Sequence, residues 1–214
     1  MLSVNAKSGE VYLYGVVGGG MFEDGFTESD VLKALSDLGN KRATVRINSP
    51  GGSADQGISI YNALKRHKYG VDTVVDSLAA SAASVIALAG EKRTSSIGSR
   101  WMIHRAMTFE VGNANRMRKT ADVLEKYDDS LIEIYSQYMS SDDIKSLLEA
   151  ETWYTADEAM QAGLATEVDG KTDAKPAIAA WFENPPDDLV EQAVKNTYSA
   201  KFKILRSKLV DLAI

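Results

Sequence analysis

Patterns typical of strands and of helices alternate along the first half of the chain, and this alternation limits the folds that it can adopt. Residues 10–17 and 43–48 are rich in β-branched and aromatic residues, as strands are. The helical pattern between them begins after Thr27 and ends at Gly39, and Ser53 can cap a further helix after the second strand. Because parallel strands are joined by helical crossovers, the alternation over residues 1–105 predicts an α/β fold built from β–α units.

The next strand pattern runs directly into a stretch of small residues. Residues 71–76 are predicted to form a strand, and the alanines and serines of residues 79–84 continue into a helical pattern. Ser81 is therefore expected close to the point where a strand gives way to a helix. Another strand is predicted over residues 100–104, so that His104 ends it.

Composition excludes several classes of protein. The 214 residues include no cysteine, which rules out a disulfide scaffold, a cysteine-ligated zinc site and a thiol nucleophile. The net charge is −6, whereas a general nucleic-acid binder is usually basic, so no nucleic-acid partner is expected. No apolar run approaches the roughly 18 residues of a membrane span, and the first residues do not resemble a signal peptide. We therefore expect a cytoplasmic protein with no membrane contact.

One helical pattern runs from about Asn113 to Met139 and is long for a chain of this size. Asp128 interrupts its apolar face, which consists of Met117, Ala121, Leu124, Leu131, Tyr135 and Tyr138. Such a helix is expected to project from its own core or to pack on a partner, and an ordinary core helix is the alternative. A short helix near residues 142–148 and a capping box over residues 155–158 follow.

The last forty residues differ from the rest. Pro176, Pro185 and Pro186 indicate a linker over residues 173–187, which would separate a catalytic domain over residues 1–172 from the C-terminal segment. Residues 188–214 are predicted to form a basic amphipathic helix. That helix would suit a membrane, an acidic partner or nucleic acid, although a solvated surface helix is the simplest interpretation.

Three local features have the chemistry of an active site. A serine at a helix start, such as Ser81, lies near free backbone N–H groups that favour a developing oxyanion, although Ser84 is a competing candidate. The turn Pro50-Gly51-Gly52 follows a strand and exposes backbone N–H groups. Of the two histidines, His104 ends an apolar strand and can serve as a general base, whereas His67 lies in the basic end of a helix and receives no role.

These features occur together in a recognisable order. Residues 46–52 (Arg-Ile-Asn-Ser-Pro-Gly-Gly), Ala79-Ala80-Ser81, residues 101–104 (Trp-Met-Ile-His) and residues 155–159 (Thr-Ala-Asp-Glu-Ala) resemble the Clp protease proteolytic subunit in order and spacing. The resemblance covers about residues 10–170. Divergence elsewhere resembles the Clp-like proteases of phages and prophages that act in head maturation, which would place the protein in the bacterial host cytoplasm.

The resemblance implies a serine endopeptidase with the spiral of β-β-α units shared by Clp proteases and crotonases, and with a protruding handle helix. Ser81 would be the nucleophile, His104 the general base and Glu151 the third triad member, where the family most often has aspartate; Glu149 is a second choice. The backbone N–H groups of Gly51 and Ala82 would form the oxyanion hole.

The resemblance also implies what surrounds the site. Residues 108–114 would line the substrate cleft as a strand, and the handle helices would join copies of the chain into rings. The substrate would be a polypeptide, and no metal or cofactor is implied. Few residues precede the first strand, so an ATPase partner is not expected. Two alternatives are a crotonase-like acyl-CoA enzyme and a catalytically inactive assembly protein on the same fold.

Overall fold

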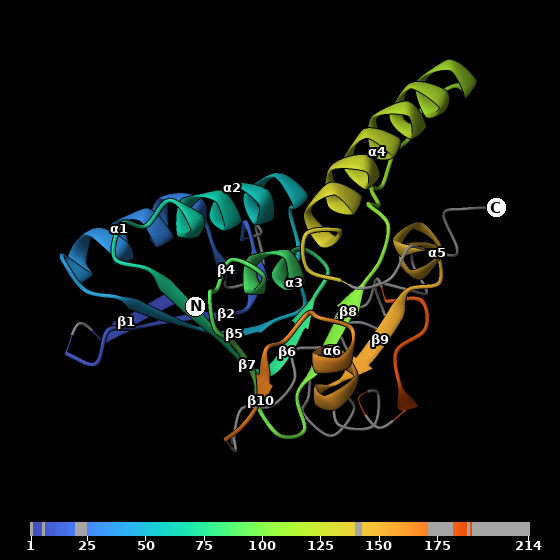
Figure 1. Ribbon diagram of the computed structural model, residues 1–214. Helices are drawn as coiled ribbons and strands as arrows, with labels where there is room; N and C mark the ends of the chain where they lie inside the picture. The colour runs from blue at the N-terminus through green and yellow to red at the C-terminus, as the bar shows by residue number, and fades with distance from the viewer. Residues whose placement is uncertain are drawn as a thin grey trace.

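The structure is a computed structural model that describes residues 2–5, 7–19, 25–139, 143–170, 182–187 and 189. Helices cover one face of a mixed sheet, and one long helix projects from the body (Figure 1). The strands are β1 Leu2–Asn5, β2 Glu10–Tyr14, β3 Val16–Val17, β4 Gly25–Phe26, β5 Ala43–Ser49, β6 Val71–Ala80, β7 Arg93–Ser95, β8 Arg100–Ile103, β9 Thr152–Thr155 and β10 Glu167–Val168. The helices are α1 Glu28–Leu38, α2 Ala54–Lys65, α3 Ala82–Ala87, α4 Ala114–Tyr135, α5 Ile144–Glu149 and α6 Ala156–Gln161.

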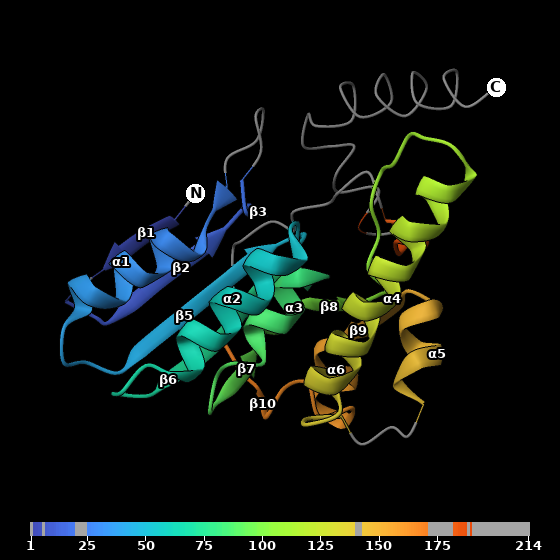
Figure 2. The ribbon, with the colours of Figure 1, turned by 90° about the horizontal axis from the view of Figure 1, so that it is seen from above.

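The main sheet is built around parallel crossovers, as the alternation of patterns predicts. Strands run in the order β1-β2-β5-β6-β7-β10; β8 branches from β6, and β9 pairs with β8. The pairs β2–β5, β5–β6, β6–β7 and β6–β8 are parallel, whereas β1–β2 and β8–β9 are antiparallel. Helices α1, α2 and α3 lie over the same face of this sheet (Figure 2). The predicted α/β class is therefore confirmed.

Strand β6 is longer than the sequence pattern indicates. It extends through Ala80, so that the small residues before Ser81 belong to the strand and α3 begins directly after it. The first half of β6 pairs with β7, and Leu78, Ala79 and Ala80 pair with β8. One strand thus connects both halves of the sheet, and its carboxyl end carries Ser81 to the end of β8, where His104 follows.

Helix starts agree closely with the predicted capping residues. The side chain of Thr27 caps α1 and that of Ser53 caps α2. Thr155 and Glu158 form a capping box at the start of α6, with each side chain bonded to the other residue's backbone. These caps satisfy backbone N–H groups that a helix leaves without partners, so short local motifs are sufficient to place the helix starts.

Helix α4 is the long helix that the sequence predicts, with Asn113 as its N-cap. Its first half projects away from the sheet (Figure 1). The second half packs on the domain: Leu131 and Tyr135 are buried in the main core. The predicted apolar face is therefore divided, because its C-terminal part is covered by this chain itself.

The segment before α4 does not form the strand that was predicted for it. Residues 108–114 were expected to form a strand along the cleft, but residues 104–113 have no strand pairing, and Ala114 is already the first residue of α4. Phe109 and Val111 in this segment are exposed. An extended edge needs a partner strand for its hydrogen bonds, and the described residues offer none there.

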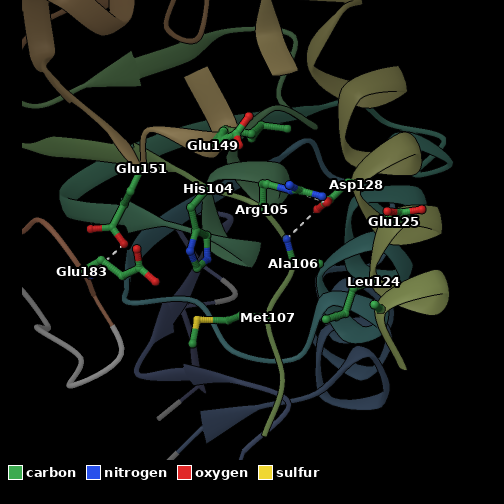
Figure 3. Close-up of a pocket in the computed structure, with 12 residues that line it drawn as sticks. His104, Arg105, Ala106, Met107, Leu124, Glu125, Asp128, Glu149, Glu151 and Glu183 are labelled. Atoms are coloured by element: carbon green, nitrogen blue, oxygen red, sulfur yellow. Dashed lines mark hydrogen bonds and ion pairs between the residues drawn. The ribbon is translucent and has the colours of Figure 1, made fainter. Parts of the chain in front are cut away.

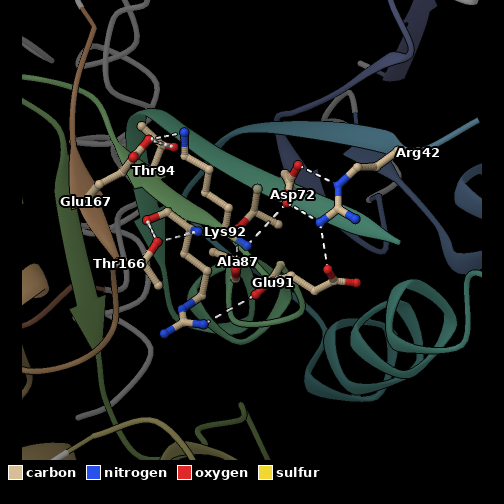
Figure 4. A network of polar contacts seen from close by, with 11 residues as sticks. Arg42, Asp72, Ala87, Glu91, Lys92, Thr94, Thr166 and Glu167 are labelled. Carbon is tan, nitrogen blue, oxygen red and sulfur yellow. Dashed lines mark hydrogen bonds and ion pairs between the residues drawn. The ribbon is translucent and has the colours of Figure 1, made fainter. Parts of the chain in front are cut away.

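A polar network secures the sheet at the end remote from Ser81 (Figure 4). Arg42 donates to Asp72 over 2.6 and 2.7 Å and to Glu91 over 2.8 Å. Lys92 and Thr94 both contact the Glu167 carboxylate. These contacts join the starts of β5 and β6 to β7 and β10, so they fix the frame without entering the site.

Among the described residues, none of the helices combines the length and the apolar character that a bilayer crossing requires. The same residues contain no group of three or more histidine or acidic side chains arranged to hold a metal ion.

Asp128, the charged residue that interrupts the apolar face of α4, makes hydrogen bonds to the segment after β8. It is buried, and its carboxylate accepts from Arg105 Nε and from the backbone N–H of Ala106, both over 2.7 Å. These bonds attach the segment that follows His104 to α4.

Asp128→Ala should therefore lower the free energy of unfolding by about 1–3 kcal/mol, because the Ala106 N–H loses its acceptor. Chemical denaturation measures the change, and Asp129→Ala, at an exposed position on the same helix, is the matched control. Equal stability of the two variants would contradict this account.

Candidate active site

Ser81 occupies a strained turn between β6 and α3. Its backbone has φ 54° and ψ −129°, a conformation that residues with a side chain rarely adopt. Among the described residues, only Ser81 and Glu151 combine a side chain with a positive φ. Strain of this kind costs about 1–3 kcal/mol per residue and concentrates at functional sites. Both residues are ones that the sequence analysis selected.

The turn at Gly51 touches the turn at Ser81. Gly51 has φ 93°, and a Cβ added there would lie 2.6 Å from Ser81 Cβ and 2.7 Å from the Ala80 carbonyl oxygen. Only glycine permits this approach. The Pro50-Gly51-Gly52 turn therefore has a specific role, because it brings backbone from the end of β5 against the serine.

His104 lies within hydrogen-bond distance of the serine. Its Nε2 is 2.8 Å from Ser81 Oγ. Burial lowers the pKa of His104 below its ordinary value of 6.5, and three carboxylates oppose the shift: Glu151, Glu183 and Asp128. A low pKa keeps the imidazole neutral near pH 7, so Nε2 can accept the serine proton.

Glu151 is near His104 but makes its hydrogen bonds elsewhere. It is buried, and φ is 48° just after the C-cap of α5, where glycine is usual. The carboxylate accepts from the Trp153 indole over 3.1 Å and from the backbone N–H groups of Glu183 and Asn184 over 2.8 and 2.7 Å. Its oxygens thus bind other groups of the described chain rather than the His104 ring.

The two predicted oxyanion donors lie beside the serine. Ala82 is the first residue of α3, where a backbone N–H has no acceptor inside the helix. The Gly51 N–H donates to Ser49 Oγ over 3.1 Å, so this donor has an internal partner in the structure. A Cβ added at Gly51 would lie 3.1 Å from the backbone N of Ala82, so the Gly51 turn and the start of α3 are in contact.

The remaining candidates have structural contacts or lie apart. Ser84 is fully buried, where its hydroxyl contacts the Ser81 carbonyl at 2.6 Å and the Tyr135 hydroxyl at 2.7 Å. His67 Nε2 lies 3.0 Å from the Lys41 carbonyl, just beyond the C-terminal end of α2. Glu149 is exposed at the end of α5.

A cleft of about 300 Å³ opens beside His104 (Figure 3). Its walls come from the segment after β8, from α4, from the α5–β9 connection and from Glu183. The acidic lining residues are Glu125, Asp128, Glu149, Glu151 and Glu183. Glu183 was not selected from the sequence; the large aromatic residue Phe182 next to it in the predicted linker was the available signal that this segment contacts the core.

A serine hydroxyl held against a neutral imidazole, on a strained strand-to-helix turn, is the arrangement typical of serine hydrolases. The sequence profile of the Clp protease family matches residues 28–172, more than half of the chain. The chain therefore belongs to the Clp protease family.

Individual relatives agree with this assignment. The ATP-dependent Clp protease proteolytic subunit 1 of Protochlamydia amoebophila is 36% identical over 128 residues, which cover 57% of this chain and 62% of that protein. The corresponding subunit of Bacteroides fragilis is 35% identical over 132 residues, covering 60% and 64%. The matches thus span less than two thirds of the relatives' length. A ClpP1 variant from Listeria monocytogenes has the same fold, with a TM-score of 0.67 at 24% identity over 78% of this chain and 95% of that one.

The burial of His104 leads to a prediction that does not depend on any reaction. His104 should titrate below pH 6.5, because desolvation outweighs the pull of the nearby carboxylates. The chain has only two histidines, so NMR of ¹³Cε1-labelled histidine resolves both, and His67→Gln assigns them. A midpoint for His104 at or above 6.5 would show that the carboxylates dominate instead.

Proposed function

We propose that this chain is a serine endopeptidase that hydrolyses peptide bonds of polypeptide substrates through an acyl-enzyme. The observation that carries the proposal is the 2.8 Å contact between Ser81 Oγ and His104 Nε2 on the strained turn. Family membership supports the same reaction, because the curated relatives are named as protease subunits.

The residues supply each step of the reaction. The Ser81 hydroxyl gives its proton to His104 Nε2 as its oxygen attacks the substrate carbonyl carbon. The backbone N–H groups of Ala82 and Gly51 stabilise the oxyanion, and Gly51 exchanges the Ser49 hydroxyl for the substrate oxygen. The imidazolium then protonates the leaving amine. In the second half of the reaction His104 takes a proton from water as the water oxygen attacks the acyl-enzyme. The imidazolium then returns that proton to Ser81 Oγ as the acid product leaves.

Glu151 takes the third role through its charge. It opposes the loss of basicity that burial imposes on His104, and so it stabilises the imidazolium that forms in each transition state. These steps use only groups of the protein, the substrate and water. The Ser81–His104 contact favours a peptidase over a crotonase-like acyl-CoA enzyme, which usually acts through carboxylates, and over an inactive assembly protein.

Three finer proposals go beyond family membership: two follow the resemblance to phage proteases, whereas action without an ATPase departs from the curated relatives, which are named as ATP-dependent. They are a phage or prophage origin with a role in head maturation, action without an ATPase, and a place in the bacterial host cytoplasm. Cleavage of a folded protein substrate by the purified chain, without nucleotide or unfoldase, tests the second of these, because a short peptide needs no unfolding.

Ser81→Ala should abolish peptide cleavage, with a loss on the order of 10⁶-fold in rate, and should leave the fold intact. A fluorophosphonate should label the wild type at Ser81 and fail to label this variant. His104→Ala should lose activity as well, whereas the control His67→Ala should keep it. Labelling at another serine, or activity that survives Ser81→Ala, would refute the assignment.

Exposed apolar side chains support the proposed assembly. Five of the eight large hydrophobic residues that are exposed among the described ones lie in the segment before α4 and in its projecting half: Met107, Phe109, Val111, Met117 and Val123. A concentration of this kind marks an interaction surface, and a two-fold contact with a second copy uses the patch twice. We therefore place the contact between copies on the projecting half of α4.

The assembly proposal requires that Met117→Asp combined with Val123→Asp lowers the oligomeric state, because the contact would then bury unpaired charge. Both positions are exposed in the single chain, 40% and 45%, so the fold should survive. Met160→Asp, at an exposed apolar position on α6, is the control. Light scattering decides, and a monomeric wild type, or an oligomer that the double replacement leaves unchanged, would exclude this contact.

A further inference from the structure

Residues 182–184 lie against the site, although the sequence analysis places them in a linker. Phe182 is 5% exposed and packs with Leu78, Ala80 and Met102, which belong to the two strands that end at Ser81 and His104. Its ring meets the Trp153 ring edge-on, with centroids 5.1 Å apart. This aromatic anchor fixes the segment on the strands that carry the serine and the imidazole.

Glu151 provides the second attachment. Its two carboxylate oxygens accept the backbone N–H groups of Glu183 and Asn184, and the Trp153 indole supports one of them. Hydrogen bonds to an ionised carboxylate are about twice as strong as neutral ones. A buried, fully bonded carboxylate is therefore a rigid support, and it holds the backbone of Glu183 at a defined place.

The consequence is that the Glu183 side chain enters the cleft beside His104. Both residues line that cleft, and Figure 3 shows the Glu183 and Glu151 carboxylates on the same side of the imidazole. In the proposed reaction Nε2 accepts the proton of Ser81, so the other ring nitrogen carries a proton and needs an acceptor. Among the described residues, His104 has Ser81 as its one hydrogen-bond partner.

We propose that Glu183 is a positioning residue for His104, held at the cleft by Glu151 and Phe182, and that its carboxylate orients the imidazole and stabilises its protonated form. The inference rests on the proposed function of the Ser81–His104 pair. In this arrangement Glu151 supports the segment by hydrogen bonds and acts on His104 through its charge, and Glu183 adds a second carboxylate beside the ring.

Other charged groups around His104 are less suited to orienting the ring. Asp128 is bonded to Arg105 and to the Ala106 backbone, so its carboxylate is committed to the α4 contact. Glu151 is committed to the segment itself. The charged residues that line the cleft with His104 are Arg105, Glu125, Asp128, Glu149, Glu151 and Glu183. Of these, Glu151, Glu183 and Asp128, in decreasing order, raise the pKa of His104 against the larger lowering by burial.

The test is the titration of His104 by NMR, with His67 as the internal reference. Glu183→Gln should lower the His104 midpoint by about one pH unit or less, because a nearby negative charge is lost from a partly solvated position. The backbone bonds to Glu151 remain in this variant. Glu183→Asp should recover most of the shift, and Asp187→Asn, an exposed acid in the same segment, is the control.

A second variant tests the anchoring without removing a charge. Phe182→Ala should move the His104 midpoint in the same direction as Glu183→Gln, because the segment loses its packing. Combined with Glu183→Gln it should add little, since both changes remove one interaction. An unchanged midpoint in Glu183→Gln, an equal shift in Asp187→Asn, or no shift in Phe182→Ala would overturn the proposal.

Activity provides a separate result. In an active enzyme, Glu183→Gln should lower the maximal kcat and move the acid limb of the kcat/KM profile to lower pH by the same amount as the NMR midpoint. If the wild type cleaves no peptide and still shows the NMR shifts, the proposed function fails and the interaction between Glu183 and His104 stands. If it cleaves peptides and shows no shift, only the present inference fails.

Discussion

The contact between two turns, at Gly51 and at Ser81, is the constraint on which the site depends. The backbone of Ser81 is strained at the end of β6. Position 51 has no room for a side chain, because a Cβ there would collide with the Ser81 turn. The strain persists because the sheet fixes both ends: β5 and β6 are paired along their length, and the register shifts just before the turns, between Ile47 and Ser49. The hydrogen bonds between β5 and β6 thus hold Ser81 in a backbone conformation that the turn alone would not adopt.

Small residues make this arrangement possible on the helix side as well. A Cβ added at Gly57 in α2 would lie 2.9 Å from the Ala82 side chain, so α2 and α3 approach each other more closely than ordinary side chains allow. Ser84 is buried beneath the turn between the Ser81 carbonyl and Tyr135 of α4. The alanines and serines of residues 79–84 are therefore packing residues, and Ser81 is the one whose hydroxyl faces His104.

Local sequence signals predict the elements well where the cause is local. Thr27, Ser53 and Thr155 satisfy backbone groups within a few residues of themselves, so their motifs place three helix starts. Local signals fail where the structure of a segment is determined by residues that are distant in the sequence. The small residues before Ser81 suggest a helix, but pairing with β8 keeps them in β6. The strand expected over residues 108–114 has no partner strand among the described residues. The contact of Phe182 with β6 and β8 depends on residues about 80 to 100 positions away.

The same distinction applies to the site. The order of motifs selects Ser81, His104 and Gly51 through the resemblance to the family, whereas the local pattern alone leaves Ser84 as a second candidate. The order of motifs is insufficient to select the carboxylate that acts on His104, because a carboxylate acts over several ångströms and can come from any segment that the fold brings near. Glu151 has a strained backbone with φ 48°, yet its oxygens bind backbone N–H groups from residues 183 and 184. The basicity of His104 is then a balance between burial, which the core imposes, and charges that a more distant part of the chain supplies.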